Sequence, residues 1–512
     1  MWAQTGTGGQ AGAAGRTQAQ APRVTIANGK LEGRVEASGV FSFKGVPYAT
    51  PPVGALRFKE PQPALSWKGV RKATHFGPRA MQLPIYSDMQ FRSDGMSEDC
   101  LYLNIWTPAV GVQAHLPVLV YFYGGGFVGG DGSEYRYDGE SLASRGCVTL
   151  TVNYRLGVFG FLAHPELTRE SAHHSSGNYG LMDQHAALVW VQQNIAAFGG
   201  DPRHVTIAGE SAGSFSVSAQ MATPLSAGLF AGAIGESGSL LGGRTAPLAE
   251  GEETGVRFAA GLGNKSLADL RAMPAADLLA ATSNAEHFPV VVDGYFFPKS
   301  PDDIFKSGEQ MQVPLLAGWN SAESNYTGLL DHEEPTVAAF EAAVRRTYGD
   351  KADAVLAAYK ASTESEVKQA GTDLASAQFI AFGTWKWIDL HSKTGGGVPV
   401  YRYLYAHPRP DAVGSAGSGR SAYGAGHSWE IEYALGNLKT NKVYAWDKDD
   451  FAVSATMEGY FENFVKRLDP NGAGLPVWER VSGGEPAVMV IDVVSRQEKA
   501  VRDERYKVLD IR

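Results

Sequence analysis

The chain has 512 residues, of which 19% are charged and 44% hydrophobic, and its formal net charge is −9. So apolar a chain is not expected to be disordered, and its negative charge argues against a nucleic-acid-binding protein, whose phosphate contacts need a basic face. Two cysteines are too few for a disulfide scaffold or a four-cysteine zinc site, and no run of about 18 apolar residues predicts a membrane-spanning helix.

The first segment, residues 1–22, consists mostly of Gly, Ala, Gln and Thr. It lacks the apolar stretch of about 7–15 residues that an intact export signal contains. We therefore expect residues 1–23 to be a disordered leader, either the stub of a removed signal or an addition made for expression. From this tail we expect a secreted or periplasmic protein, with a cytoplasmic one as the alternative.

Two short strands are expected next, at residues 24–26 and 35–43, with an Asn28-Gly29 hairpin signal between them. Three later runs are continuously apolar and rich in strand-forming residues: 116–123, 147–154 and 205–208. Continuous apolar runs of this length are typical of strands buried on both faces of a sheet.

A helix is predicted over residues 182–198, where apolar side chains recur at helical spacing until Gly199-Gly200. Strand, helix and strand in this order predict an α/β layered fold. Residues 408–426 are rich in Gly and Ser, but apolar patterning resumes on both sides. We interpret them as a long surface loop and not as a domain boundary.

The segment at residues 209–213 (GESAG) has the pattern G-x-S-x-G, with a predicted strand before it and a predicted helix after it. A turn this sharp is expected to strain the backbone of Ser211 and to present its hydroxyl as a nucleophile. The flanking glycines would let strand and helix pack closely, and the helix N-terminus would point amides at an oxyanion. The alternative is an ordinary capping serine in a tight turn.

Three consecutive glycines follow the apolar run at 116–122, in residues 123–127 (YGGGF). Without side chains, their amide N–H groups are free to face a ligand, as in the glycine-rich loop of some hydrolases. The spacing alone does not decide which of the three amides donate. The alternative is a flexible glycine turn.

Further motifs occur in a fixed order: 43–49 (FKGVPYA) with 51–54 (PPVG), 97–104 (SEDCLYLN), 153–157 (NYRLG), 177–184 (GNYGLMDQ) and 198–202 (FGGDP). Together with the serine segment they resemble the type-B carboxylesterase family of α/β-hydrolases, which includes cholinesterases and bacterial para-nitrobenzyl esterases. The resemblance extends from about residue 24 to the end of the chain.

This resemblance implies the partners of Ser211. Residues 318–324 (GWNSAES) resemble the segment that bears the family's catalytic acid, which makes Glu323 the acid. Residues 424–431 (GAGHSWEI) resemble the histidine segment, which makes His427 the base. Among 12 histidines and many carboxylates, the residues alone would not have selected these two.

The resemblance also implies supporting groups. The oxyanion donors would be the amides of Gly125, Gly126 and Ala212. Ser237 resembles a serine that helps to hold the acid. Glu210 either assists electrostatically or is a polar residue that the turn merely tolerates.

The implied protein is an α/β-hydrolase with a large, mostly parallel central sheet flanked by helices and with lid or cap insertions. Length alone, at about 150 residues per domain, allows two to four domains, but the spread of motifs predicts one domain over residues 24–512. The implied activity is carboxylic ester hydrolysis with a small-molecule ester as partner and without a metal or organic cofactor. A bacterial protein that is a monomer or homodimer is expected. The alternatives are a specialised esterase for a bulky ester, such as a pyrethroid, a polyester fragment or a mycotoxin, and a non-catalytic interaction protein.

The chain departs from many family members at two places. Tyr123 stands where many have histidine, and its phenol either hydrogen-bonds a substrate or packs as an aromatic residue. Phe127 and Trp319 are further candidates for the pocket. Ala80 stands where the usual disulfide partner of Cys100 is expected, so we predict that Cys100 and Cys147 are buried and unpaired.

Several other charged residues are interpreted as structural. Arg57 with Glu98, and Arg155 with Asp183, match ion pairs that brace the family's fold. Arginines in or near the long loop would attract an acidic substrate or, as we prefer, be solvated: Arg402, Arg409 and Arg420.

Overall fold

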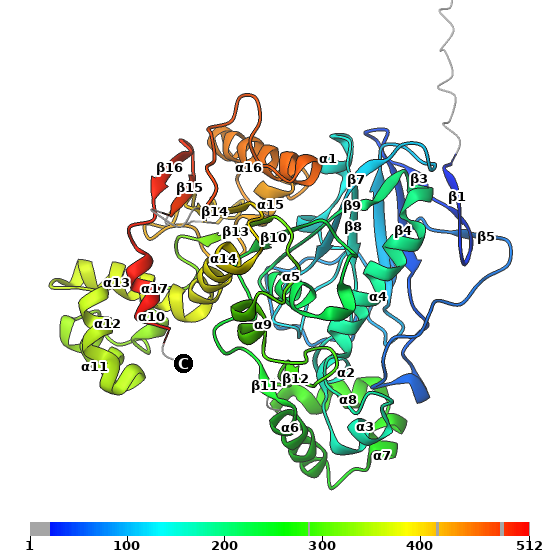
Figure 1. Ribbon diagram of the computed structural model, residues 1–512, viewed down its shortest axis with the longest axis horizontal. Coiled ribbons are helices and arrows are strands. Elements are labelled where there is room, and N and C mark those ends of the chain that lie inside the picture. The colour runs from blue at the N-terminus through cyan, green and yellow to red at the C-terminus, as the bar shows by residue number, and fades with distance from the viewer. Residues whose placement is uncertain (1–20, 285–286, 416–418, 482–485, 511–512) are drawn as a thin grey trace, which may run out of the picture.

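The computed structural model describes residues 21–284, 287–415, 419–481 and 486–510. The expected leader lies outside these residues except for its last positions. An eleven-stranded sheet forms the centre of the molecule (Figure 1). In sheet order its strands are β16 (Arg496–Lys499), β15 (Ala487–Ile491), β14 (Val400–Tyr405), β13 (Leu315–Asn320), β10 (Gly232–Glu236), β9 (Gly200–Glu210), β7 (Leu116–Phe122), β8 (Val148–Val152), β6 (Tyr102–Thr107), β4 (Phe41–Pro47) and β3 (Arg34–Val35).

The strands from β8 to β15 in this order pair in parallel, and antiparallel strands complete both edges. The continuous apolar runs explain the parallel centre, because helices cover both faces of such a sheet. Every residue of β8 is buried. The predicted strands at 116–123 and 147–154 are confirmed, and the one at 205–208 is part of the longer β9.

The prediction of one strand over residues 35–43 is wrong. β3 ends at Val35 and β4 begins at Phe41, because a turn intervenes in which the Glu36 amide donates to the Val40 carbonyl oxygen. Gly39 supplies the positive φ of 90° that this turn needs. The hairpin signal at Asn28-Gly29 is confirmed, but it joins β1 (Arg23–Ile26) to β2 (Gly29–Glu32), which pairs with β5 (Val70–Lys72).

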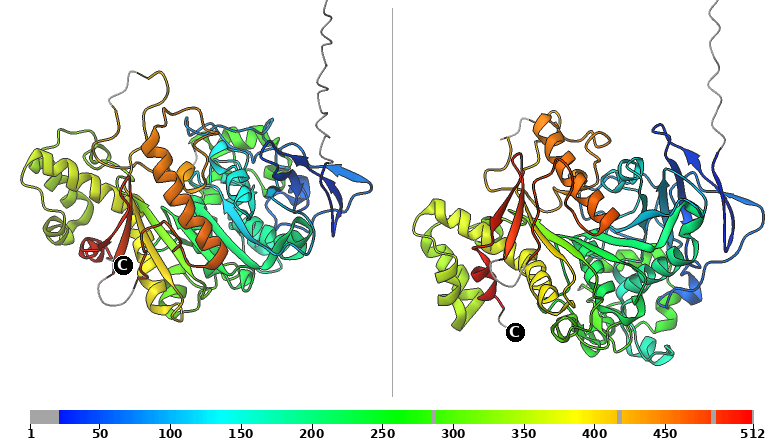
Figure 2. Two further views of the ribbon diagram at one scale, coloured as in Figure 1. Left: turned by 90° about the horizontal axis from the view of Figure 1, so that it is seen from above. Right: turned by 45° about the horizontal axis from the view of Figure 1, so that its top comes forward.

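The helices surround the sheet, and Figure 2 shows the longest, α16, crossing the face opposite to α4, α5 and α14. The predicted helix at 182–198 is α4 followed by a 3₁₀ turn, and Gly199, at a φ of 86°, ends it. No helix in the described ranges has the length and apolarity of a membrane span. The helices are α1 (Glu140–Ser144), α2 (Gly157–Phe161), α3 (Pro165–Glu170), α4 (Tyr179–Asn194), α5 (Ala212–Ala222), α6 (Leu248–Gly261), α7 (Leu267–Ala272), α8 (Ala275–Ala281), α9 (Pro301–Ser307), α10 (Tyr326–Leu329), α11 (Val337–Tyr348), α12 (Ala352–Ala358), α13 (Glu364–Ser376), α14 (Phe382–Thr394), α15 (Ile431–Ala434), α16 (Lys448–Arg467) and α17 (Asp503–Lys507).

Helices α10–α13 form an insertion beside the sheet, at the left of Figure 1. Their apolar side chains pack into a hydrophobic cluster of their own, separate from the main core. Leu509, just after α17, belongs to the same cluster. The insertion is thus joined to the C-terminal segment as well as to the chain on either side of it.

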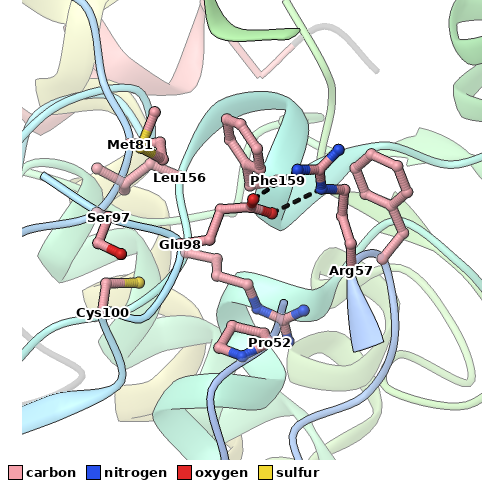
Figure 3. Close-up of a pocket in the computed structure, with 11 residues that line it drawn as sticks. Pro52, Arg57, Met81, Ser97, Glu98, Cys100, Leu156 and Phe159 are labelled. Atoms are coloured by element: carbon pink, nitrogen blue, oxygen red, sulfur yellow. Dashed lines mark hydrogen bonds and ion pairs between the residues drawn. The ribbon is translucent and has the colours of Figure 1, made fainter. Parts of the chain in front are cut away.

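Both expected ion pairs are confirmed. Arg57 binds Glu98 through two hydrogen bonds, of 2.6 Å and 2.5 Å, beside a small cavity whose wall includes Cys100 (Figure 3). Arg155 binds Asp183 through two hydrogen bonds of 2.7 Å, and both side chains are buried. Each pair joins two segments of the chain, and its paired hydrogen bonds offset part of the free-energy cost of removing two charges from water.

Both cysteines lie in the described part of the chain and are free and buried, as predicted. Burial raises the pKa of the Cys100 thiol well above its usual value, and Asp183 adds to the effect. Burial likewise raises the pKa of Cys147, to about 12. Neither thiol is therefore expected to be reactive at neutral pH.

The prediction of solvated arginines is wrong for Arg402 and Arg409, which are both buried. The guanidinium of Arg402 donates two hydrogen bonds to Asp503, and that of Arg409 stacks on the ring of Tyr444 at 3.9 Å. Arg420 is more exposed and pairs with Asp447 and Asp450. None of these contacts was visible in the sequence, because each partner belongs to a distant segment.

Candidate active site

Ser211 lies at the sharp turn between β9 and α5, near the centre of the sheet. Its backbone has a φ of 54° and a ψ of −120°, a conformation that residues other than glycine rarely adopt. The strain that the G-x-S-x-G pattern led us to expect is therefore present. It exposes the serine hydroxyl at the carboxyl end of the central strands.

The two glycines of the pattern are required by crowding. A Cβ atom on Gly209 would lie 2.5 Å from the carbonyl carbon of Gly213, and one on Gly213 would overlap the carbonyl oxygen of Phe122. Strand β7, strand β9 and helix α5 thus meet with only backbone between them. The turn can form because both positions are glycine; any larger side chain at either one would collide with the neighbouring backbone.

The structure brings the three residues of the implied triad together. The Nε2 atom of His427 lies 2.9 Å from the Ser211 Oγ atom, and its Nδ1 atom lies 2.6 Å from Oε2 of Glu323. Glu323 follows β13, and His427 lies in the loop before α15. The side chain of His427 is 23% exposed and that of Glu323 is fully buried, so the base faces solvent and the acid does not.

Glu323 is held from its far side. Its Oε1 atom accepts hydrogen bonds from the Asn320 amide at 2.6 Å and from the Ser237 hydroxyl at 2.5 Å. Ser237 therefore lies where its resemblance to a supporting serine implies. These donors fix the carboxylate so that Oε2 is directed at the imidazole.

The glycine loop lies directly against the nucleophile. A Cβ atom on Gly124 would lie 2.7 Å from the Glu210 carbonyl oxygen and 3.1 Å from the Ser211 Cβ atom. Gly125 and Gly126 have φ values of 113° and 62°. Within the described residues, the amides of Gly125, Gly126 and Ala212 have no protein acceptor, and such unpaired amides are what an oxyanion hole requires.

Two carboxylates act on the base. Burial alone would lower the pKa of His427, but Glu210 and then Glu323 outweigh it and raise this pKa to about 9. The Oε1 atom of Glu210 lies 3.2 Å from Nε2 of His427. Burial raises the pKa of Glu210 as well, and His427 opposes that rise. Near neutral pH the two groups therefore compete for one proton.

Substitution Glu210→Gln is expected to shift the acidic limb of the pH profile of kcat/KM to lower pH by at least about one unit, since an opposite charge this close shifts a pKa by about 1–3 units. The limb reports protonation of His427, which must be neutral to act as a base, and the Glu210 charge raises that pKa. Steady-state rates from pH 5 to 10 measure it. In the matched control Glu236→Gln, at the register position beside Glu210, the limb should stay in place. Equal shifts in both variants would exclude a specific effect of Glu210.

The structure places the remaining pocket candidates differently: Phe127 lies near the serine helix, and Tyr123 lies in the core. Phe127 packs against the Phe161 ring at 4.9 Å and near Phe215, which follows the serine on α5. Tyr123 is only 1% exposed and stacks on Tyr154 at 4.5 Å, so the packing interpretation fits it and the pocket assignment does not. Its phenol is turned to the Tyr154 carbonyl oxygen.

Trp319 is also not brought to the serine. It is 4% exposed and stands edge-to-face with Tyr506, in the wall of a separate cavity. The sequence alone did not decide on which side of the sheet this ring lies, because successive side chains of a strand point to opposite faces.

Two neighbours of the triad were missed. Glu430 is fully buried, and its Oε2 atom accepts a hydrogen bond of 2.6 Å from Asn320. Burial and the nearby Glu323 raise its pKa to about 7. Phe379 stands edge-to-face on the His427 ring at 4.9 Å. Glu430 lies within the histidine segment, which was a usable signal; nothing in the sequence pointed to Phe379.

Within the described residues, no group of three or more His, Cys, Asp or Glu side chains is arranged to hold a metal ion. The site instead offers a hydroxyl, an imidazole and a carboxylate in series beside unpaired amides. This arrangement is suited to acyl transfer through a serine nucleophile.

Comparison with known proteins agrees with the geometry. A model of the carboxylesterase family matches residues 20–509. The chain is 37% identical over 439 residues to the fumonisin B1 esterase of Sphingopyxis macrogoltabida, a match covering 81% of this chain and 74% of that protein. It is 35% identical over 431 residues to the para-nitrobenzyl esterase of Bacillus subtilis (strain 168), which covers 81% and 83%. The crystal structure of the Geobacillus stearothermophilus carboxylesterase EST55 at pH 6.2 superposes with a TM-score of 0.82 at 31% identity, covering 95% of this chain and 99% of that one.

Proposed function

The chain belongs to the carboxylesterase family and is a carboxylic ester hydrolase, and from that premise we propose that Ser211, His427 and Glu323 carry out its reaction. The observation that supports this assignment is the unbroken series of hydrogen bonds from the Ser211 hydroxyl through His427 to Glu323. A nucleophile, a base and an orienting acid in this order form the machinery of serine acyl transfer.

In the first half of the reaction, His427 takes the proton of Ser211 while the hydroxyl oxygen attacks the ester carbonyl. Glu323 accepts the hydrogen bond from Nδ1, selects the tautomer whose Nε2 is free, and stabilises the imidazolium. The amides of Gly125, Gly126 and Ala212 bind the oxyanion that forms, and each such donor is worth about 3–4 kcal/mol of the barrier.

In the second half, the imidazolium of His427 protonates the departing alcohol and leaves an acyl group on Ser211. Water then enters, gives a proton to His427 and attacks the acyl carbon. His427 returns that proton to the Ser211 oxygen as the acyl–oxygen bond breaks, which releases the acid and restores the serine. The strained backbone of Ser211 places the acyl carbon under the three amides in both halves.

We also propose that bulky esters are accepted. Partial exposure of His427 and 42% exposure of Phe379, which touches it, support an open rim at the site. Two related proteins carry the names fumonisin B1 esterase and, in Rattus norvegicus, pyrethroid hydrolase Ces2e. Each name specifies a substrate of its own protein, and an open rim suits an ester with large groups on either side.

Stopped-flow hydrolysis of para-nitrophenyl esters tests both proposals. An acyl-serine intermediate should give a burst of one para-nitrophenol per chain before steady turnover when deacylation is slower. A covalent serine adduct, found by mass spectrometry of the peptide that contains Ser211 after rapid acid quenching, should accompany the burst. An adduct at another residue would refute the mechanism, and loss of turnover with acyl groups larger than butyryl would refute the open rim.

We further propose that the protein is bacterial, as the relatives from Sphingopyxis macrogoltabida and Bacillus subtilis are, and, from the composition of residues 1–22, that it is exported. Its assembly is proposed to be a monomer or a homodimer. Sedimentation of the purified chain distinguishes these two states.

A further inference from the structure

A second cavity lies at the C-terminal edge of the sheet, away from the serine. Its volume is about 370 Å³, and neither Ser211 nor His427 is among the residues that line it. Strands β13–β16, helix α13 and helix α17 supply its walls. Asn320, whose amide binds Glu323, lies in its wall, but no residue of the proposed triad or oxyanion hole does.

The lining is basic although the protein as a whole is acidic, at a net charge of −9. Four arginines, Arg402, Arg496, Arg502 and Arg505, line it together with two acidic side chains, Asp373 and Glu498. Glu498 pairs with Arg496, Asp373 pairs with both Arg502 and Arg505, and Asp503, beside the lining, pairs with Arg402. These four arginines therefore carry one positive charge in excess of the three carboxylates.

The most deeply placed of these cations is Arg402. Its side chain is 5% exposed, and its Nη1 atom donates to both Asp503 oxygens, at 2.7 Å and 3.0 Å. Its Nε atom is buried and has no hydrogen-bond partner among the residues that the structure describes. An unmet donor on a buried guanidinium is costly, and a bound acceptor would remove the cost.

The basic groups are also held in place. The Arg402 guanidinium stacks on the Trp319 ring at 4.7 Å, and that of Arg505 stacks on Tyr359 at 5.3 Å and binds Asp373 at 2.5 Å. Held guanidinium groups lose little conformational entropy when they bind a ligand, and their planar donors match carboxylate and phosphate oxygens. The cavity thus combines volume, excess positive charge and an unmet buried donor.

We propose that this cavity binds a small multivalent oxyanion, of the polycarboxylate or phosphate class, between Arg402 and the arginines of the C-terminal segment. Occupancy fastens α17 and β16 to β14, because the anion bridges side chains from all three. The ligand is neither substrate nor product in this role, so binding does not depend on the serine.

Isothermal titration of the full-length protein with citrate, and separately with inorganic phosphate, tests the proposal at constant ionic strength. We expect saturable binding with one site per chain and a higher thermal unfolding midpoint with the anion present. Stronger binding of citrate identifies the polycarboxylate class, and stronger binding of phosphate the other; each result supports the site. Absence of saturable binding for both anions overturns it.

Variants locate the binding. Arg402→Lys keeps the charge beside Asp503 but removes the Nε donor, and Arg502→Gln removes a charge whose side chain is 64% exposed. Each should weaken binding by about tenfold, the usual loss for one charge-assisted hydrogen bond. The second variant keeps the test valid if the first does not fold. Arg203→Gln, an exposed arginine on β9 that pairs with Asp201, is the matched control and should bind normally.

Two measurements distinguish anion binding in this cavity from binding at the Ser211 site. The variant Ser211→Ala should bind the anion as the unaltered protein does, whatever its activity. Citrate should not compete with a neutral ester in steady-state assays. Competitive inhibition, or equal affinity losses in Arg502→Gln and Arg203→Gln, would overturn the proposal, and neither outcome depends on whether the triad assignment is correct.

Discussion

Substitution Ser211→Ala is expected to lower kcat for ester hydrolysis by about four to six orders of magnitude while leaving the fold intact. Removal of the nucleophile ends acyl transfer to the enzyme, and the remaining amides and substrate binding leave only about a 10³–10⁴-fold acceleration over water. The alanine methyl group occupies space that the serine Cβ already fills, although the residue keeps its strained backbone. Initial rates with a para-nitrophenyl ester and the thermal unfolding midpoint are the two measurements.

The matched control for this variant is Ser218→Ala, in the same helix. Its hydroxyl donates to the Phe215 carbonyl oxygen at 2.8 Å and accepts from the Leu240 amide at 2.9 Å. This variant should lose some stability and keep kcat within about threefold, because the hydroxyl only supports the helix. Turnover by Ser211→Ala at the rate of the unaltered protein would end the assignment of Ser211 as nucleophile.

Substitution Glu323→Gln is expected to lower kcat by about 10⁴-fold with little change in structure. Oε1 is held by the Asn320 amide and the Ser237 hydroxyl, so the glutamine oxygen is expected to take its place. The amide nitrogen would then face Nδ1 of His427 and donate to it. This contact selects the wrong tautomer, in which Nε2 carries the proton and does not act as a base.

Glu430→Gln separates this effect from the mere removal of a buried charge. Glu430 accepts a hydrogen bond from the side chain of Asn320, whose backbone amide binds Glu323, and it is as deeply buried. Among the described contacts it has none with the imidazole nitrogens. Its pKa of about 7 means that the carboxyl is partly neutral already at neutral pH. A loss of less than about tenfold is expected. If both variants lost activity equally, the burial of charge and not the orientation of His427 would explain the result.

The sheet and the turn at Ser211 were predictable because they depend on local signals. Continuous apolar runs predicted β7 and β8, and Gly209 and Gly213 predicted a close approach of backbones that the structure contains. The error at residues 35–43 has a local cause as well. A single Gly39 supports a turn there, and a short turn between two strand-forming stretches is easily taken for part of one longer strand.

The partners of the serine were not predictable from the residues alone. Glu323 and His427 lie 104 positions apart in the chain, and their contact arises only when β13 and the loop before α15 meet at one end of the sheet. The resemblance to a family supplied them. The same limit applies to Arg402, whose burial depends on Asp503 and Trp319 from distant segments. Contacts between residues of distant segments produce no repeating pattern in the sequence, so sequence reasoning does not detect them.

The crowded meeting of β7, β9 and α5 divides the protein into a part that tolerates no redesign and a part that does. Positions 124, 209 and 213 accept only a hydrogen atom as side chain, so any engineered variant must keep them. Helices α10–α13, by contrast, carry their own apolar cluster beside the sheet. A library built in that insertion would vary the surroundings of the site while the reacting atoms stay in place, since substrate preference in such folds is set by loops and insertions on a fixed scaffold.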